Sequence, residues 1–114
     1  MKRIDVIVAH DRLVDINRIV REHGIGGMTF YIIKGRGRSK LEPVSIGRGI
    51  KRYTPEYQMR VKCEIIVPDN MVKLIVKELT RIFNTGSVSD GKIFVYEVVA
   101  AYDIKTRRTG DVVL

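Results

Sequence analysis

The segment from Gly86 to Ile93 has the spacing of a phosphate-binding loop. It reads Gly86-Ser87-Val88-Ser89-Asp90-Gly91-Lys92-Ile93, which satisfies the pattern G-x-x-x-x-G-K. Glycines expose backbone N–H groups to a phosphate, and the ammonium group of Lys92 adds a positive charge. A P-loop hydrolase would need Ser or Thr after the lysine to hold Mg²⁺, and the loop would open a helix; here Ile93 follows, in a predicted strand. The segment fits phosphate binding without hydrolysis, or equally an ordinary turn between a helix and a strand.

A second glycine set, Lys34-Gly35-Arg36-Gly37-Arg38, closes a predicted strand. Small residues let a ligand approach the backbone, and the guanidinium of Arg38 can form paired hydrogen bonds to a phosphate. The start of a flexible solvated loop, or a basic RNA-binding segment, would have a similar composition.

The remaining reactive side chains form no catalytic or metal-binding set. His10 and His23 stand at opposite ends of a predicted helix without a second ligand at useful spacing, which favours surface or capping roles. Cys63 is the only cysteine and lies in an apolar run, so we expect a small buried hydrophobic residue in a strand. The acidic residues are scattered, and no nucleophile has a base beside it. The sequence favours a binding protein over an enzyme and predicts no metal site.

The charge of the chain points to an acidic ligand or partner. The net charge is +8 over 114 residues, and the stretch from Lys34 to Arg52 holds seven basic residues against the single acid Glu42. Nucleic acid, anionic lipid, a phosphorylated small molecule and an acidic protein surface are all compatible with this charge. The sequence has no apolar run of membrane-spanning length and no signal-like N-terminus, so we expect a cytoplasmic protein.

Hydrophobic periodicity predicts the order β-α-β, long loop, β-α-β. This order matches the ferredoxin-like α+β arrangement, two split βαβ units forming one antiparallel sheet with both helices on one face. We expect residues 1–114 to form a single domain. The apolar strands imply that the other face is also buried, most simply by further subunits in a closed cyclic oligomer. In the first half, the predicted elements are a strand Ile4–Val8, a helix capped by Asp11 and running to about His23, and a strand Met28–Ile33. A loop without regular structure follows from Gly35 to about Gln58. In the second half they are a strand Met59–Val67, a helix begun by Pro68-Asp69-Asn70 and stopped by Asn84-Thr85-Gly86, a strand Lys92–Ala100 and a basic tail Lys105–Arg108.

Taken together, these segments resemble the PII family of nitrogen-regulatory signal proteins. The similarity covers most of the chain, and the joint order of the motifs is more specific than any one of them. The motifs are Met1-Lys2-Arg3-Ile4-Asp5, Gly24-Ile25-Gly26-Gly27-Met28-Thr29, Lys34-Gly35-Arg36-Gly37-Arg38, Arg48-Gly49, Val61-Lys62, Thr85-Gly86, Asp90-Gly91-Lys92-Ile93-Phe94 and Thr109-Gly110.

The resemblance implies a homotrimer that binds ATP or ADP in three clefts between subunits. It also implies that a long T-loop, here residues 36–57, changes shape with the ligand and docks on a partner such as an ammonium transporter or a nitrogen-assimilation enzyme. Arg38 and Lys92 would contact the phosphates. The residues that match the family's nucleotide site are Thr29, Gly35, Gly37, Arg38, Glu64, Ser89, Asp90, Gly91 and Lys92, with Ser89 standing where the family has a glycine.

The chain departs from the family pattern around the predicted 2-oxoglutarate site. Ser39, beside Lys40, stands where the family usually has a glutamine that helps to hold Mg²⁺ and 2-oxoglutarate. Arg60 replaces a lysine that pairs with the 2-oxoglutarate carboxylate, and it is longer and planar. The resemblance therefore implies nucleotide binding more strongly than it implies binding of 2-oxoglutarate.

The loop tip and the tail, residues 103–114, align less directly. Arg48, Gly49 and Tyr53 are the predicted partner-contacting residues, and Tyr53 is the nearest match to the family's modifiable tyrosine in a loop about two residues longer than usual. For the family's phosphate-clasping arginine pair, a gapless alignment gives Asp103 and Lys105, whereas a shift of two residues gives Arg107 or Arg108.

Two other functions remain open at this level. A nucleic-acid-binding module could use the basic loop, although Tyr53 and Tyr57 are that loop's only aromatic residues and no stacking platform is evident on the strands. A trimeric metal-binding relative on the same fold is disfavoured by the small number of histidines and cysteines.

Overall fold

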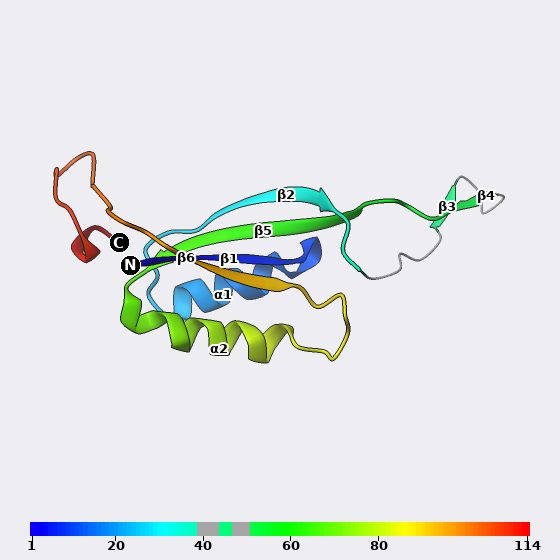
Figure 1. Cartoon of the computed structure of the whole chain (residues 1–114), viewed down its shortest axis with the longest axis horizontal. Helices are drawn as coiled ribbons and strands as arrows, with labels where there is room; N and C mark the ends of the chain where they lie inside the picture. The colour runs from blue at the N-terminus through cyan, green and yellow to red at the C-terminus, as the bar shows by residue number, and fades with distance from the viewer. Residues whose placement is uncertain (39–43, 47–50) are drawn as a thin grey trace.

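The structure, a computed structural model, is built on a four-stranded antiparallel sheet with two helices on one face (Figure 1). It describes the backbone of residues 1–38, 44–46 and 51–114, and the side chains of residues 1–38 and 54–114. The sheet order is β2-β5-β1-β6, which is the ferredoxin-like order predicted from the sequence. The elements are β1 Lys2–Ala9, α1 Leu13–Glu22, β2 Thr29–Gly35, β3 Val44–Ile46, β4 Lys51–Tyr53, β5 Gln58–Val67, α2 Val72–Phe83 and β6 Lys92–Glu97.

Alternation along the two central strands produces the hydrophobic core. On β1 the residues Ile4, Val6 and Val8 are buried toward the helices, because successive side chains of a strand point to opposite faces. The core is completed by Val61, Cys63, Ile65 and Val67 of β5, Ile16, Ile19 and Val20 of α1, and Ile75, Leu79 and Phe83 of α2. Cys63 is fully buried, as predicted, and this burial raises the pKa of its thiol to about 11.

Both helix starts differ from the prediction. Asp11 does not cap a helix but lies in a 3₁₀ turn, His10–Arg12, that precedes α1. Asp69 likewise lies in a 3₁₀ turn before α2, and its carboxylate instead accepts the N-terminal ammonium of Met1 at 2.9 Å. The 3₁₀ turns begin the helical path, so neither aspartate is in the capping position. The predicted end of the first helix is confirmed, since Gly24 adopts a left-handed φ of 65°.

Two further predictions, one about the loop and one about the last strand, are corrected by the structure. The loop predicted to lack regular structure contains a short antiparallel ribbon, in which Val44 pairs with Tyr53, and Figure 1 shows this ribbon projecting beyond the end of β2 and β5. The last strand, β6, ends at Glu97 and not at Ala100. Within the described residues, no helix has the length and apolar character that crossing a bilayer requires.

The helix-free face of the sheet holds a buried carboxylate. Asp5 is 0% exposed and lies between two cations, with Arg3 Nε 3.0 Å and Lys62 Nζ 3.3 Å from its oxygens. The guanidinium of Arg3 also lies 4.4 Å from the centre of the Tyr96 ring. Around this cluster the same face presents half-exposed apolar side chains, among them Tyr96 and Phe94. The face therefore combines a fully buried carboxylate, paired with two cations, with apolar side chains that remain partly exposed.

Gly91 fixes the position of the turn that precedes β6. Its φ is 130°, and a Cβ placed on it would lie 2.2 Å from the carbonyl oxygen of Ile7 in β1. A side chain at this position would therefore face both a strained φ and a clash with backbone that cannot move aside.

We expect Gly91→Ala to lower the free energy of unfolding by about 2 kcal/mol or more, because both penalties act together. Urea denaturation measures this change. Gly37→Ala is the matched control, since nothing lies within 4 Å of its added Cβ and its φ is not left-handed; its effect should be within about 0.5 kcal/mol of zero. Equal losses for the two variants would contradict the prediction.

Candidate functional site

The two glycine segments singled out in the sequence meet at one end of the helix-free face. They line a cleft of about 760 Å³ between the end of β2, the start of β5 and the start of β6. The cleft brings together six of the predicted site residues from three separate parts of the sequence. These six are Gly35, Gly37, Arg38, Arg60, Gly91 and Lys92, and the cleft is completed by Ile7, Ile33, Arg36, Gln58, Val88 and Phe94.

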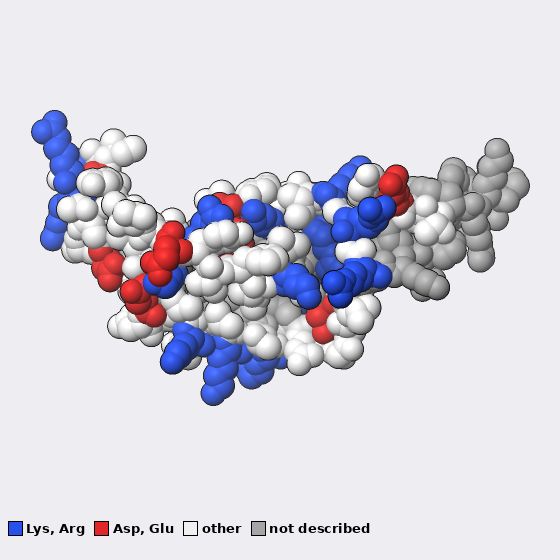
Figure 2. Space-filling view, in the orientation of Figure 1, with Lys and Arg blue, Asp and Glu red and all other residues white. Residues whose placement is uncertain are grey.

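The lining of this cleft is strongly cationic. Its lining residues include Arg36, Arg38, Arg60 and Lys92, and the described lining contains no Asp or Glu. Among the residues whose side chains are described, one ion pair involves these four cations: Nη1 of Arg36 lies 3.8 Å from Oε1 of Glu56. Figure 2 shows Lys and Arg side chains gathered where the loop leaves the sheet. Such a concentration of positive charge, with small residues beside it, suits a ligand with several phosphate or carboxylate groups.

A second cavity, of about 350 Å³, lies on the other side of the Gly91–Lys92 backbone, between α2 and β6. Its lining is mainly apolar and includes Val76, Leu79 and Phe83. Because it offers little positive charge, we regard the larger cationic cleft as the candidate site for an anionic ligand.

The turn between α2 and β6 is held by its own hydrogen bonds. The carboxylate of Asp90 accepts the backbone N–H of Thr85 at 2.7 Å and also the hydroxyl of Thr85. The amide of Ser89 donates to the hydroxyl of Ser87 at 3.1 Å, and the amide of Asp90 to the carbonyl of Ser87 at 3.3 Å. Asp90 and the amides of Ser89 and Asp90 therefore build the turn, and Lys92 supplies its positive charge to the cleft.

Arg60 is joined to this turn. Its guanidinium donates to the carbonyl oxygen of Ser89 at 2.9 Å and to the side-chain oxygen of Gln58 at 3.0 Å. Arg60, for which the resemblance implies contact with 2-oxoglutarate, thus makes two hydrogen bonds within the chain.

The other predicted nucleotide residues lie elsewhere in the chain. Thr29 pairs with Glu64 at the far end of β2 and β5, whereas Gly35 pairs with Gln58 at the cleft. Six residues of strand separate the two ends, or about 20 Å. Glu64 accepts the hydroxyl of Tyr31 at 2.7 Å, and this hydrogen bond is the main reason why the pKa of Glu64 is lowered.

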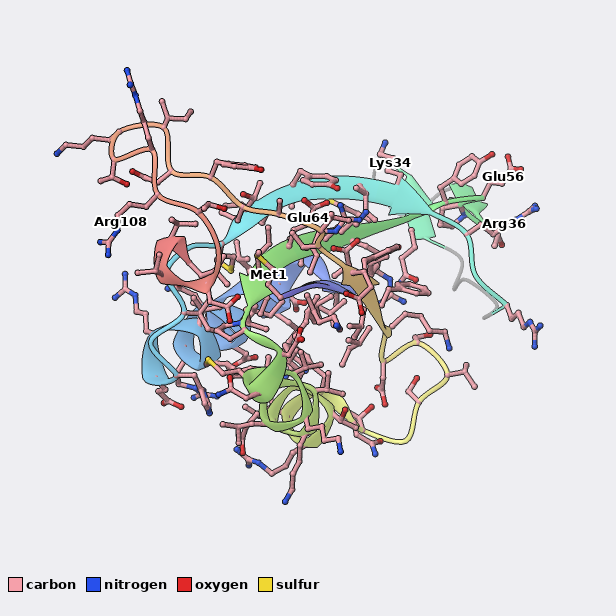
Figure 3. The ribbon with its side chains drawn as sticks, turned by 60° about the vertical axis from the view of Figure 1, so that its left-hand side comes forward. Met1, Lys34, Arg36, Glu56, Glu64 and Arg108 are labelled. Carbon is pink, nitrogen blue, oxygen red and sulfur yellow. The ribbon has the colours of Figure 1, made fainter. Side chains whose placement is uncertain are left out.

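The tail forms a tight turn far from the cleft. The carboxylate of Asp103 accepts the amide of Thr106 at 2.6 Å and its hydroxyl at 2.7 Å, so Asp103 closes the turn and does not project into a site. Lys105, Arg107 and Arg108 are exposed on this turn. Figure 3 shows Arg108 and Arg36 on opposite sides of the molecule. One chain therefore carries two separate groups of predicted site residues.

Several cleft residues were not predicted as site residues. Gln58 could have been inferred from strand pairing, because it faces Gly35 across the base of the loop. Ile7, Ile33 and Phe94 carry no local signal, since an apolar strand residue looks the same whether it lines a cleft or a core. Of the remaining predictions, Ser39, Lys40, Arg48 and Gly49 lie outside the described residues, and for Tyr53 only the backbone, in β4, is described.

The two histidines lie at opposite ends of the first helical segment, His10 in the 3₁₀ turn before α1 and His23 directly after α1. His23 Nδ1 lies 2.9 Å from the carbonyl oxygen of Ile19, in keeping with the predicted capping role at the end of α1. In the described part of the chain, the structure shows no cluster of three His, Cys, Asp or Glu side chains placed to hold a metal ion.

Three comparisons with known proteins agree. The family described as "Nitrogen regulatory protein P-II" matches residues 1–108. The chain is 39% identical over 111 residues to nitrogen regulatory protein P-II 1 of Escherichia coli (strain K12), covering 97% of each chain. It is 35% identical over 106 residues to nitrogen regulatory protein P-II of Haemophilus influenzae, covering 93% of each. Among solved structures it is similar to GlnK of B. subtilis, with 27% identity, a TM-score of 0.77, and coverage of 99% of this chain and 97% of that one. A complex of B. subtilis GlnK with ATP has the same fold, with a TM-score of 0.76 at 24% identity over 99% of this chain and 96% of that one.

The hydrogen bonds between Thr85 and Asp90 lead to a prediction about the pKa of Asp90. They hold the pKa of Asp90 below the ordinary aspartate value, chiefly through the Thr85 side chain. A lowered folded-state pKa means that the stabilisation is present above the unfolded value of about 3.9 and is lost as the pH falls through the lower folded value. In Thr85→Val we therefore expect the pKa of Asp90 to rise, measured by carboxyl-carbon NMR titration.

Asp103 serves as the control in the same spectrum. Its pKa is also lowered, mainly by Thr106, and Thr85→Val leaves that partner in place. If Asp90 titrates identically in the wild type and in Thr85→Val, the assigned cause is wrong.

Proposed function

Because the chain belongs to the nitrogen regulatory protein P-II family, whose members are signalling regulators and not enzymes, we propose that it binds ATP or ADP in the cationic cleft and regulates a partner protein through residues 36–57. The observation that carries this proposal is the convergence of Arg38 and Lys92, from separate glycine segments, on one cleft whose described lining contains no Asp or Glu. The solved ATP complex of a protein with the same fold supports the choice of ligand.

We propose that the complete site lies between subunits of a homotrimer. The phosphate-suited group at the cleft and the group formed by Thr29, Glu64 and the tail are too far apart to share one ligand within a chain. A neighbouring copy would bring its second group to the first group of this chain. The half-exposed apolar side chains around buried Asp5 support the same arrangement, because they offer the surface that such a copy would cover. Of the tail candidates, exposed Lys105, Arg107 and Arg108 are better placed to reach a phosphate than Asp103 is.

The proposed signal passes through the base of the loop. Gly37 and Arg38 line the cleft and also begin the loop, so a ligand that contacts them acts on the loop directly. We propose that the loop then reaches a transporter or enzyme of nitrogen metabolism in the cytoplasm, with Arg48, Gly49 and Tyr53 as the contacting residues.

We include 2-oxoglutarate, with Mg²⁺, as a second effector for one reason. Arg60 lines the same cleft and offers a fixed positive charge. Binding a carboxylate there would require the guanidinium to share or release its bonds to Ser89 and Gln58.

Titration calorimetry with ATP and ADP tests the proposal. We expect both nucleotides to bind, and Arg38→Ala or Lys92→Ala to weaken binding about tenfold or more, since each removes a charge-assisted hydrogen bond. Lys73→Ala on α2 is the control: it removes an exposed charge outside the cleft and should leave affinity unchanged. A folded protein that gives no heat with either nucleotide contradicts the proposal, and tight binding of single-stranded RNA in its place would favour the nucleic-acid alternative.

Mixed oligomers test whether two chains build each site. Lys92→Ala and the double variant Arg107→Ala with Arg108→Ala should each bind nucleotide poorly. After the two variants are unfolded and refolded together, some interfaces should pair an intact cleft with an intact tail, and calorimetry should detect restored binding. The same variants refolded separately are the control, and a mixture no better than its parents would place the site within one chain.

A further inference from the structure

The side chain of Arg60 connects two segments that are far apart in the sequence. One nitrogen donates to the backbone carbonyl of Ser89 at 2.9 Å, and another donates to Oε1 of Gln58 at 3.0 Å. Ser89 belongs to the turn between α2 and β6. Gln58 is the first residue of β5, where the chain returns to the sheet from the loop.

These two partners belong to different borders of the cleft: Gln58 lines it, and Ser89 lies in the turn whose residues Val88, Gly91 and Lys92 line it. Gln58 pairs with Gly35, so it marks the base of the loop, whereas Ser89 is followed directly by Asp90, Gly91 and Lys92. Arg60 therefore spans the cleft from the loop base to the turn that carries the lysine.

The turn's own hydrogen bonds do not connect it to the sheet. Its tip is exposed, with Val88 86% accessible, and its hydrogen bonds join residues no more than five apart. On its far side the turn is fixed to β1 through Gly91. Among the described residues, the Arg60–Ser89 hydrogen bond connects the near side of the turn to β5.

The shape of arginine suits this role better than its charge alone. A planar guanidinium can donate to two acceptors at once in a fixed geometry, whereas the single nitrogen of a lysine on a flexible stem cannot hold both in the same way. The two acceptors are an uncharged carbonyl and an uncharged amide oxygen, so the contacts set position and leave the positive charge in the cleft.

We propose that Arg60 is a positioning residue that holds the Ser87–Lys92 turn against the base of the loop, so that the placement of Lys92 and the conformation of the loop base depend on each other. This role differs from direct pairing with a 2-oxoglutarate carboxylate, which the resemblance implies for this position. Its consequence for affinity rests on the proposed nucleotide function, but the contact itself does not.

Hydrogen exchange of the free protein tests the contact without any ligand. The amides of Ser89 and Asp90, both internally hydrogen-bonded, report on the turn. In Arg60→Ala we expect them to exchange about tenfold faster, since a turn that loses a charge-assisted bond opens more often. Core amides of β1 should keep their protection, which separates a local change from a damaged fold.

Two further variants separate position from charge. Arg36→Ala removes a cation from the same cleft, but no bond to the turn is seen for Arg36, so turn exchange should equal that of the wild type. Arg60→Lys keeps the charge and loses the two-acceptor geometry, so we expect its turn to exchange faster than in the wild type. If turn exchange in Arg60→Ala equals that of the wild type, or if Arg36→Ala accelerates it as much, the proposal is overturned.

ATP titration of the same variants adds the functional readout. We expect Arg60→Lys to bind ATP several-fold more weakly than the wild type, because the turn that carries Lys92 is less well placed. Wild-type affinity in Arg60→Lys, with loss only in Arg60→Ala, would show that charge alone matters and would overturn the positioning role. If the wild type itself binds no ATP, the proposed function fails while the exchange result still decides the role of Arg60.

Discussion

The close approach of Gly91 to the backbone of β1 is the constraint on which the candidate site depends. With no Cβ, Gly91 lets the chain pass the carbonyl of Ile7 and enter β6 at a φ of 130°. This contact decides where β6 starts, and so it decides that Lys92 lies beside Ile7 at the end of the sheet. The cleft exists because the same end of the sheet is where β2 stops and the loop begins.

Three kinds of interaction act around that contact: apolar burial, hydrogen bonds and the charge of the cleft. Apolar burial between β1, β5 and the two helices supplies the main stabilisation. Short-range hydrogen bonds centred on Asp90 shape the turn, and Arg60 joins the turn to the sheet. Within the described residues, no Asp or Glu lines the cleft, so Arg38 and Lys92 face a ligand without a neighbouring carboxylate there.

The helix-free face of the sheet differs from the helix-covered face because it contains a buried charged group. Asp5 is buried there between Arg3 and Lys62, under a set of apolar side chains that remain half exposed. Burying a charged pair is costly unless partners surround it. On this face two cations surround the buried carboxylate, while Tyr96 and Phe94 remain partly exposed. This exposed apolar surface is what the proposed trimer would cover.

Local patterns in the sequence were sufficient for the order of the elements and for the family. Alternating residues such as Ile4, Val6 and Val8 predict a half-buried strand, and Gly24 marks the end of a helix, because both signals depend only on near neighbours. Details of the helix starts were not predictable in this way: Asp11 and Asp69 have the right chemistry for caps, but a 3₁₀ turn precedes each helix, and Asp69 is drawn to the N-terminal ammonium of Met1. The ribbon of β3 and β4 also escaped prediction, since strands of three residues are too short to show a period.

For the site, the sequence by itself determined which residues are available: the two glycine segments, the lysine that follows one and the arginine that closes the other. Only the tertiary structure decided that these segments share one cleft, that Thr29 and Glu64 lie at the other end of the strands, and that Arg60 is bonded to Ser89 and Gln58. The physical reason is that such contacts join residues dozens of positions apart. Their partners are set by sheet order and register, which no local pattern of residues records.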